Sequence, residues 1–139
     1  LNAEVERAKR YGSKVSVLMI DLDRLKDIND SLGHAAGDAA LNRAAEIIRS
    51  SVRNSDLPAR YGGDEFLVVL VETGLRQAQA LATRLLKAIQ KDEIEFEGKR
   101  IQMTLSIGVG QFDNDATPEH LIKRVDAALY EAKQQGATA

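Results

Sequence analysis

The absence of cysteine from the 139-residue chain excludes disulfide bonds and thiolate metal sites, and it fits a reducing compartment. A net charge of −2 at pH 7 provides no basic field for holding nucleic acid, so we expect no nucleic-acid partner. No apolar stretch approaches the length of a membrane span, and no signal peptide is visible. We therefore expect a cytoplasmic location. This expectation also allows a full-length protein in which the domain is tethered to a membrane sensor.

The length and composition favour one globular domain over residues 1–139, large enough to bury a hydrophobic core. Apolar residues make up 44% of the chain and charged residues 29%, as is ordinary for a folded domain. The first residue is Leu1 rather than methionine, which suggests a piece of a longer chain.

Hydrophobic periodicity divides the chain into alternating helices and strands. Helices are predicted over residues 2–10, 24–31, 36–53 and 75–91, with a last helix that Thr117 caps and Pro118 begins. Strands are predicted over residues 15–20, 59–61 and 66–71, and a second hairpin over residues 93–110. The order β-α-α-β-β-α-β-β-α predicts an α+β fold, in which helices flank a central, mostly antiparallel sheet.

Acidic residues stand where two of these predicted strands meet. Asp21 follows the first buried strand, and Asp64 and Glu65 occupy the tip of the next hairpin, after Gly62 and Gly63. Neighbouring strands would bring the three carboxylates together, and hard oxygen ligands suit Mg²⁺ in phosphoryl or nucleotidyl transfer. The glycines would let the hairpin backbone lie against a nucleotide. In the plainer interpretation, Asp64 and Glu65 are solvated turn residues.

Further polar residues near this cluster suit a nucleotide. Arg60 and Lys26 flank the acidic residues and would neutralise phosphate charge, although Lys26 also fits a surface charge and Asp23 a helix N-cap. A carboxylate accepts from both N–H donors on the Watson–Crick edge of guanine, so Asp38 with Asn29 makes a plausible guanine reader. Alternatively, Asp38 caps the long helix and Asn29 lies in a turn.

An ordered set of short motifs covers nearly the whole chain. The set comprises Asp21-Leu22-Asp23, Lys26, Asn29, Gly33-His34, Gly37-Asp38, RYGGDEF from Arg60, SIGV from Ser106 and ALYEAK from Ala128. In this order and spacing, the chain closely resembles the GGDEF family, the diguanylate cyclases of bacterial signalling. The resemblance implies that two GTP molecules condense into cyclic di-GMP with release of two pyrophosphates. It also implies a palm-like fold, related to nucleotidyl cyclases and polymerases.

The resemblance also assigns roles to individual positions, in three groups. The metal group, for Mg²⁺ or Mn²⁺, comprises Asp21, the backbone carbonyl of Leu22, Asp64 and Glu65. The substrate group comprises Asn29 and Asp38 for guanine, Leu41 against the base, Lys26 and Lys133 for the β- and γ-phosphates, and His34, Gly62 and Gly63. The catalytic group comprises Asp64, Glu65 and Arg60, with Arg60 stabilising the transition state.

Symmetry and a second motif bear on assembly and control. One guanine reader per chain and two guanosines in the product favour a two-fold homodimer of facing domains, each presenting GTP to the other. Arg53 and Asp56 fit the Arg-x-x-Asp motif that binds product and inhibits in relatives. The alternative for Arg53 and Asp56 is a local ion pair at a helix end.

Three departures from the family pattern bear on function. Leu25 replaces the usual phenylalanine, which is a tolerable apolar exchange. Ala137 stands where relatives usually carry arginine, so either one phosphate contact is lost or the tail has been altered or cut. The segment that joins relatives to upstream regulatory domains is missing, so we expect such a domain in the full chain.

Two other functions stay open at this point. The runner-up is a catalytically weak or inactive GGDEF module that binds GTP or cyclic di-GMP as a signalling receptor. Degenerate members of that kind usually lose the glycine–acid signature, which this chain keeps. The other alternative is a related nucleotidyl transferase that acts on a different base. The pair Asn29 and Asp38 disfavours adenine, but only through the family resemblance.

Overall fold

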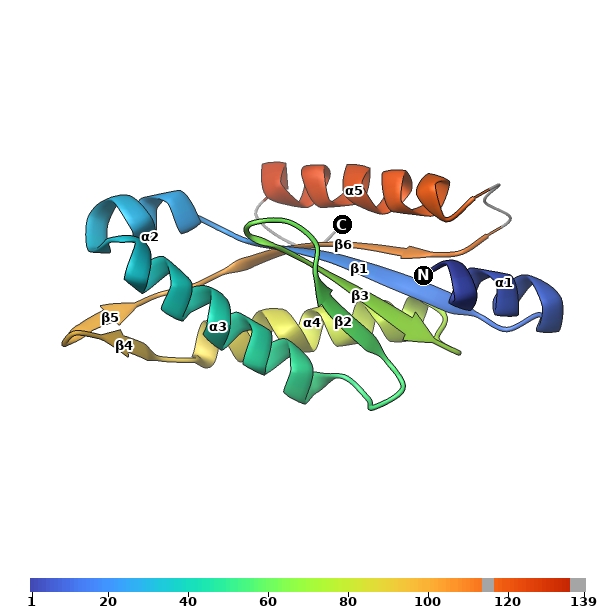
Figure 1. The fold of residues 1–139 in the computed structure, drawn as a ribbon, viewed down its shortest axis with the longest axis horizontal. Coiled ribbons are helices and arrows are strands. Elements are labelled where there is room, and N and C mark those ends of the chain that lie inside the picture. Colours follow the sequence, from blue (N-terminus) through green and yellow to red (C-terminus); the bar gives the residue numbers. More distant parts are fainter. Residues whose placement is uncertain (114–116, 136–139) are drawn as a thin grey trace.

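The computed structural model describes residues 1–113 and 117–135 (Figure 1). The helices are α1 (Asn2–Tyr11), α2 (Leu25–Leu32), α3 (His34–Ser51), α4 (Leu75–Lys91) and α5 (Pro118–Gln135). The strands are β1 (Val15–Leu22), β2 (Leu57–Arg60), β3 (Glu65–Val71), β4 (Ile94–Phe96), β5 (Lys99–Ile101) and β6 (Leu105–Gln111). The hydroxyl of Thr117 accepts a hydrogen bond from the backbone N–H of His120 at 3.3 Å, which confirms the predicted cap of α5.

The central sheet has four strands in the order β2-β3-β1-β6, and each neighbouring pair is antiparallel. Every residue of β1 is buried, because β3 and β6 pair with its two edges and helices cover both faces. The predicted α+β fold with an antiparallel sheet flanked by helices is therefore confirmed. Across the pairing, Asp21 of β1 lies opposite Glu65 of β3 and opposite Ser106 of β6.

Successive residues of β1 point to opposite faces of the sheet. Leu18, Ile20 and Leu22 belong to the core that α3 and α4 cover. Val17 and Met19 pack on the other face against residues of α5. Figure 1 shows α5 on the opposite side of the sheet from α3 and α4. By this alternation, Asp21 faces the side of α5.

Close packing of α5 depends on a glycine in β6. A Cβ atom added at Gly108 would collide with the backbone of Val125 and Leu129, so only glycine lets the helix lie directly on the strand. This contact helps to set where the later residues of α5 reach, including Lys133.

The predicted second hairpin over residues 93–110 is wrong in its extent. Its tip at Glu97 and Gly98 is correct, but the hairpin ends at Ile101, and β4 and β5 form a separate two-stranded sheet. Residues Leu105–Gln111 instead make β6, whose backbone pairs with the free edge of β1. Alternation of apolar residues marks a strand but does not say which partner the strand takes.

A helix that crosses a bilayer must be long and almost wholly apolar. In residues 1–113 and 117–135, no helix meets both requirements.

Candidate active site

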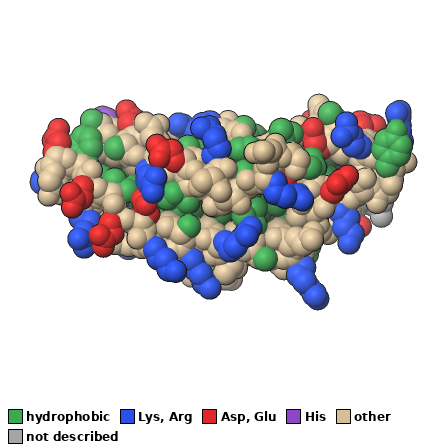
Figure 2. Space-filling model, turned by 90° about the horizontal axis from the view of Figure 1, so that it is seen from below, with side chains coloured by type: hydrophobic (Ala, Val, Ile, Leu, Met, Phe, Trp, Pro, Cys, Tyr) green, Lys and Arg blue, Asp and Glu red, His purple; other side chains and the backbone are tan. Residues whose placement is uncertain are grey.

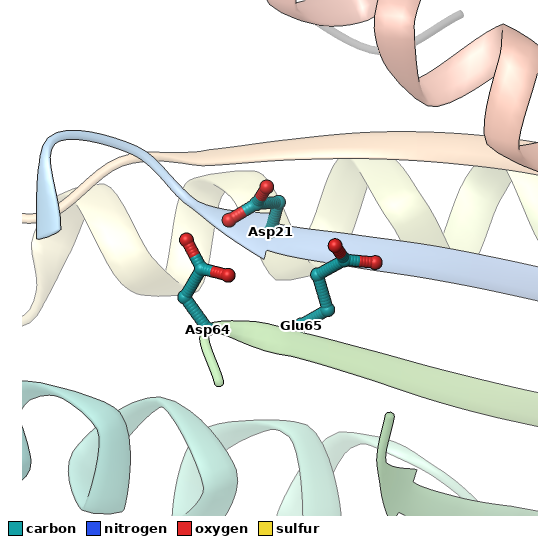
Figure 3. A group of neighbouring side chains, drawn as sticks. All are labelled: Asp21, Asp64 and Glu65. Atoms are coloured by element: carbon teal, nitrogen blue, oxygen red, sulfur yellow. The ribbon is translucent and has the colours of Figure 1, made fainter. Parts of the chain in front are cut away.

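Three carboxylates gather where β1 ends and β3 begins (Figure 3). Asp21, Asp64 and Glu65 each place a carboxylate oxygen within 4.8 Å of those of the other two. The backbone N–H of Leu22 donates to the carbonyl of Asp64 at 3.2 Å, which holds the hairpin tip against the end of β1. The predicted convergence of carboxylates from two elements is thus present in the fold.

Asp21 is the most buried member of the cluster, with 6% of its surface exposed. Burial raises the pKa of its carboxyl to about 6, and the charge of Asp64 adds to the rise, although Lys133 opposes it. Its Oδ2 pairs with Lys133 Nζ of α5 at 2.8 Å, whereas its Oδ1 is buried without a hydrogen-bond partner among the described residues. An unsatisfied buried carboxylate oxygen beside two further carboxylates is a chemically suitable place for Mg²⁺ or Mn²⁺.

The pKa values of Glu65 and Lys133 are raised as well. Burial raises the pKa of Glu65, and the nearby charges of Asp126 and Asp64 raise it further. Burial alone would lower the pKa of Lys133, but its hydrogen bond to Asp21 and the surrounding carboxylates outweigh burial and raise it. Lys133 is therefore a firmly charged ammonium group at the edge of the cluster.

A pocket of about 490 Å³ adjoins the acidic cluster on the side of α2 and α3. It brings together many of the residues predicted to bind substrate or to act in catalysis. These are Lys26, Asn29, His34, Asp38, Leu41, Arg60, Gly63 and Asp64. Gly62 lies beside the pocket in the hairpin turn, where its N–H donates to the carbonyl of Glu65 at 3.4 Å.

The structure overturns the plainer interpretations of three residues. Asp38 does not cap the long helix, because α3 begins at His34 and Asp38 lies within it. Asn29 lies within α2 rather than in a turn. Asp23 does not cap α2 either, since the capping position is occupied by Arg24.

Gly37 explains how Asn29 and Asp38 come to line one pocket. A Cβ atom added at Gly37 would collide with the Asn29 side chain, so the glycine leaves room for that carboxamide beside α3. The sequence marked Gly37 only as part of a motif, because its role depends on contact between two helices.

The hairpin presents Arg60 and leaves room beside it. Arg60 Nη2 donates to the carbonyl of Gly63 at 2.7 Å, and its guanidinium lies 5.6 Å from the centre of the Phe66 ring. Apart from its two chain neighbours, no described residue has an atom within 4 Å of the place that a Cβ on Gly63 would take, so this space is open to a ligand. The arrangement suits a phosphate or base approaching the backbone.

A family model described as "Diguanylate cyclase, GGDEF domain" matches residues 1–139. The chain belongs to the GGDEF family. Diguanylate cyclase A of Treponema denticola is 47% identical over 123 residues, which cover 88% of this chain and 33% of that protein. The GGDEF domain thus spans about a third of the length of this curated relative.

Solved structures show the same architecture. Diguanylate cyclase SiaD from Pseudomonas aeruginosa, in complex with its activator SiaC, matches with a TM-score of 0.92 and 34% identity, over 96% of this chain and 52% of that chain. The GGDEF domain of DgcB from Caulobacter crescentus, in complex with c-di-GMP, matches with a TM-score of 0.91 and 25% identity, over 100% of this chain and 85% of that chain. Both likenesses extend over nearly the whole GGDEF domain.

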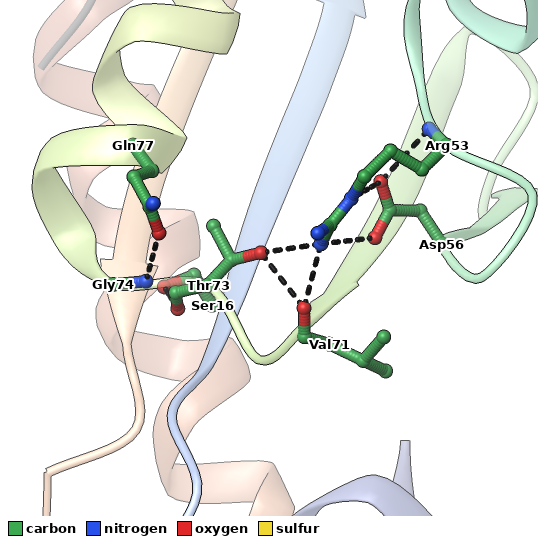
Figure 4. Close-up of polar contacts among 7 residues, drawn as sticks. All are labelled: Ser16, Arg53, Asp56, Val71, Thr73, Gly74 and Gln77. Atoms are coloured by element: carbon green, nitrogen blue, oxygen red, sulfur yellow. Dashed lines mark hydrogen bonds and ion pairs between the residues drawn. The ribbon is translucent and has the colours of Figure 1, made fainter.

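Arg53 and Asp56 of this GGDEF domain lie apart from the acidic cluster and line a cavity together with residues of α4 (Figure 4). Asp56 is buried and accepts from the backbone N–H of Arg53 at 3.0 Å and from Arg53 Nη2 at 3.2 Å. The same nitrogen donates to the Val71 carbonyl at 2.7 Å and to Thr73 Oγ1 at 2.8 Å. The predicted alternative, a local ion pair, is present, but the guanidinium is also tied to the end of β3.

These residues line a cavity of about 200 Å³ together with Arg84 of α4. Sequence reasoning missed Arg84, because nothing in an Ala- and Leu-rich helix distinguishes it from other surface arginines.

The face on the side of α3 and α4 carries Lys and Arg side chains across its middle (Figure 2). Helix α4 contributes exposed Arg84, Lys87 and Lys91 and contains no acidic residue. The lining of the cavity itself carries two arginines, Arg53 and Arg84, and one carboxylate, Asp56, so its formal charge is positive. The prediction made for Ala137, which stands where relatives usually carry arginine, falls on a residue outside the described part of the chain.

Proposed function

We propose that this GGDEF domain condenses two GTP molecules into cyclic di-GMP and releases two pyrophosphates. The observation that carries the proposal is the contact between the acidic cluster and the pocket that Asn29 and Asp38 line. A guanine-compatible pocket directly beside a metal-compatible cluster suits transfer of a guanylyl group. The names of the relatives support the same reaction.

In the proposed mechanism, the pocket residues bind and orient GTP. The Asp38 carboxylate accepts from the guanine N–H edge, Asn29 adds a polar contact, and Leu41 packs against the base. Lys26 and Lys133 neutralise the β- and γ-phosphates, for which Lys133 exchanges its contact with Asp21 for one with phosphate. Arg60 stabilises the charge that develops on the transferred phosphoryl group.

Asp21, Asp64, Glu65 and the Leu22 carbonyl would hold Mg²⁺ or Mn²⁺. When bound, such an ion supplies Lewis-acid chemistry at the α-phosphate. Glu65 lies beside Asp21 and Asp64, where it would share the metal or accept the proton of the attacking 3′-hydroxyl.

Because each domain has one guanine pocket, the proposed reaction needs two domains. In a two-fold homodimer, the 3′-hydroxyl of each GTP attacks the α-phosphate of the other. We further propose that other domains or a partner bring the two copies together, as the activator bound to SiaD suggests.

The Arg53 site is proposed to bind the product and to inhibit the enzyme. The lining of its cavity has a positive formal charge, and Arg53 and Arg84 suit the guanine Hoogsteen edge or the phosphates of cyclic di-GMP. The c-di-GMP complex of DgcB supports the capacity of such domains to hold this ligand.

Incubation of the purified protein with GTP and Mg²⁺, followed by chromatography and mass spectrometry, tests the proposed reaction. We expect cyclic di-GMP, with a specific activity that rises with protein concentration because two half-sites must meet. ATP should give no cyclic product. Asp27→Ala, which removes an exposed carboxylate of α2 away from the pocket lining, is the matched control and should retain full activity. GTP binding without product at any protein concentration would instead favour the receptor function.

A further inference from the structure

Asp23 is the second acid of the Asp-Leu-Asp motif, but its carboxylate forms hydrogen bonds with two hydroxyl groups near the start of β6. It accepts from Ser106 Oγ at 2.7 Å and from Thr104 Oγ1 at 2.9 Å. The backbone N–H of Asp23 donates to the carbonyl of Thr104 at 2.9 Å. Within residues 1–113 and 117–135, the metal-compatible cluster leaves Asp23 out. Three hydrogen bonds therefore join the β1–α2 loop to the start of β6.

The loop that Asp23 anchors has an uncommon backbone conformation. Arg24, the next residue, has φ 59° and ψ 27°, in the left-handed region that non-glycine residues rarely adopt. Such a conformation persists when the surroundings determine it from both sides. On one side are the hydrogen bonds of Asp23, and on the other the first turn of α2, where Ile28 N–H donates to the Arg24 carbonyl at 3.0 Å.

The partner residue Ser106 shows why the contact is needed. Its surface is only 1% exposed, so its hydroxyl has little access to water if Asp23 is removed. Ser106 also lies opposite Asp21 across the β1–β6 pairing. Anchoring Asp23 on Ser106 therefore fixes the loop directly behind the acidic cluster.

We propose that Asp23 is a positioning residue rather than a metal ligand, and that it holds the backbone of residues 22–26 in the shape that receives the GTP phosphates. The proposal rests on the proposed function. The loop follows Leu22 and leads into α2, whose second residue, Lys26, lines the pocket. It also borders a groove of about 660 Å³ that Asp23 shares with Lys133. A change in the loop would thus move backbone N–H groups and Lys26 together.

Substitution by asparagine separates the two roles. An asparagine amide accepts from one hydroxyl and donates to the other, because a hydroxyl both donates and accepts, so Asp23→Asn preserves the anchor. A neutral amide is a much poorer ligand for a hard cation than a carboxylate. Asp23→Ala and Ser106→Ala remove the anchor from either side.

The test is calorimetric titration of Mn²⁺ alone and of 3′-deoxy-GTP with Mn²⁺, a nucleotide that lacks the attacking hydroxyl. We expect Asp23→Asn to bind both within about threefold of the parent, since its hydrogen bonds are kept. Asp23→Ala and Ser106→Ala should each weaken 3′-deoxy-GTP binding by about 10-fold while leaving Mn²⁺ binding unchanged. The double variant should lose little more than either single variant, because both break the same contact. Asp21→Asn is the comparison that should lose Mn²⁺ binding.

Several results would overturn the assignment. Loss of Mn²⁺ binding in Asp23→Asn, to the extent seen in Asp21→Asn, would make Asp23 a metal ligand. Parent-like nucleotide affinity in both alanine variants would remove the positioning role while leaving the proposed function intact. Failure of the parent to bind 3′-deoxy-GTP would overturn the proposed function and the role of Asp23 with it. If Asp23→Ala fails to fold, Ser106→Ala and Asp23→Asn still decide between the two roles.

Discussion

Replacing Asp21 by asparagine should make the metal-free protein more stable at neutral and alkaline pH. The carboxyl is buried, and its pKa rises from 3.8 to about 6 in the folded chain. A difference of about two pKa units corresponds to about 3 kcal/mol of folding free energy, at 1.36 kcal/mol per unit. An asparagine side chain has nearly the same shape as aspartate without the charge. Lys133 loses its ion pair but is 38% exposed, so water can solvate it.

The sign of the effect follows from which state ionises first. Below pH 3.8 the carboxyl is protonated in both states, and its charge costs nothing. As the pH rises from 3.8 through about 6, the unfolded chain releases its proton before the folded protein does. The parent therefore loses up to about 3 kcal/mol relative to Asp21→Asn across this window, and the difference stays constant at higher pH.

Urea unfolding at pH 4, 6 and 8 in the presence of EDTA measures this difference. Asp27→Asn, which neutralises an exposed carboxylate of α2, is the control and should show no such pH-dependent gain. Adding Mn²⁺ should stabilise the parent and not Asp21→Asn, because only the parent keeps the buried carboxylate. The reasoning is refuted if Asp21→Asn is the less stable protein at pH 8, or if its advantage is the same at pH 4 and pH 8.

Four further substitutions test the sites. Asp64→Ala should abolish formation of cyclic di-GMP with little change in melting temperature, and full turnover would refute its role at the metal. Asp38→Ala should weaken binding of 3′-deoxy-GTP by about 10- to 100-fold because guanine N–H donors lose their acceptor, and parent-like affinity in calorimetry would argue against a guanine reader. Gly37→Ala should weaken binding of 3′-deoxy-GTP, since its Cβ displaces the Asn29 side chain from its place in the pocket, and parent-like affinity would contradict this role of the glycine. Arg53→Ala should remove cyclic di-GMP binding and relieve inhibition with GTP binding unchanged, whereas equal calorimetric affinity and stoichiometry would reduce Arg53 to an ion pair.

Local patterns in the chain placed the acidic residues at the ends of two predicted strands, and their convergence was predicted on the condition that these strands are neighbours. The apolar run ending at Asp21 reads as a buried strand, and the glycine pair before Asp64 and Glu65 reads as a turn into another. Once these two strands are neighbours, the carboxylates at their ends must converge, and the pairing of Asp21 with Glu65 confirms it. Strand periodicity and turn chemistry placed each carboxylate at a strand end, whereas the pairing of β1 with β3 joins segments far apart in the chain and is a property of the tertiary fold.

The extent of the second hairpin could not be predicted in the same way. Residues 93–110 alternate throughout, but alternation does not distinguish β5, which pairs with β4, from β6, which pairs with β1. The choice depends on which strand edge is unoccupied after the rest of the sheet has formed. The interpretation of Asp23 as a helix cap was wrong for a related reason. Its hydrogen-bond partners are Thr104, just before β6, and Ser106, the second residue of β6, and both come near Asp23 only because β6 pairs with β1.

The sequence alone thus determined which residue types stand at the end of β1 and in the hairpin, and so the kind of chemistry the site supports. Tertiary packing decided which distant side chains complete it. Lys133 reaches Asp21 because strand alternation turns Asp21 toward α5 and Gly108 lets that helix lie on the sheet. Arg84 reaches the cavity of Arg53 only through the packing of α4. Strand periodicity and turn chemistry act between neighbouring residues and are legible in the sequence, whereas contacts between packed helices and strands depend on the geometry of the whole core.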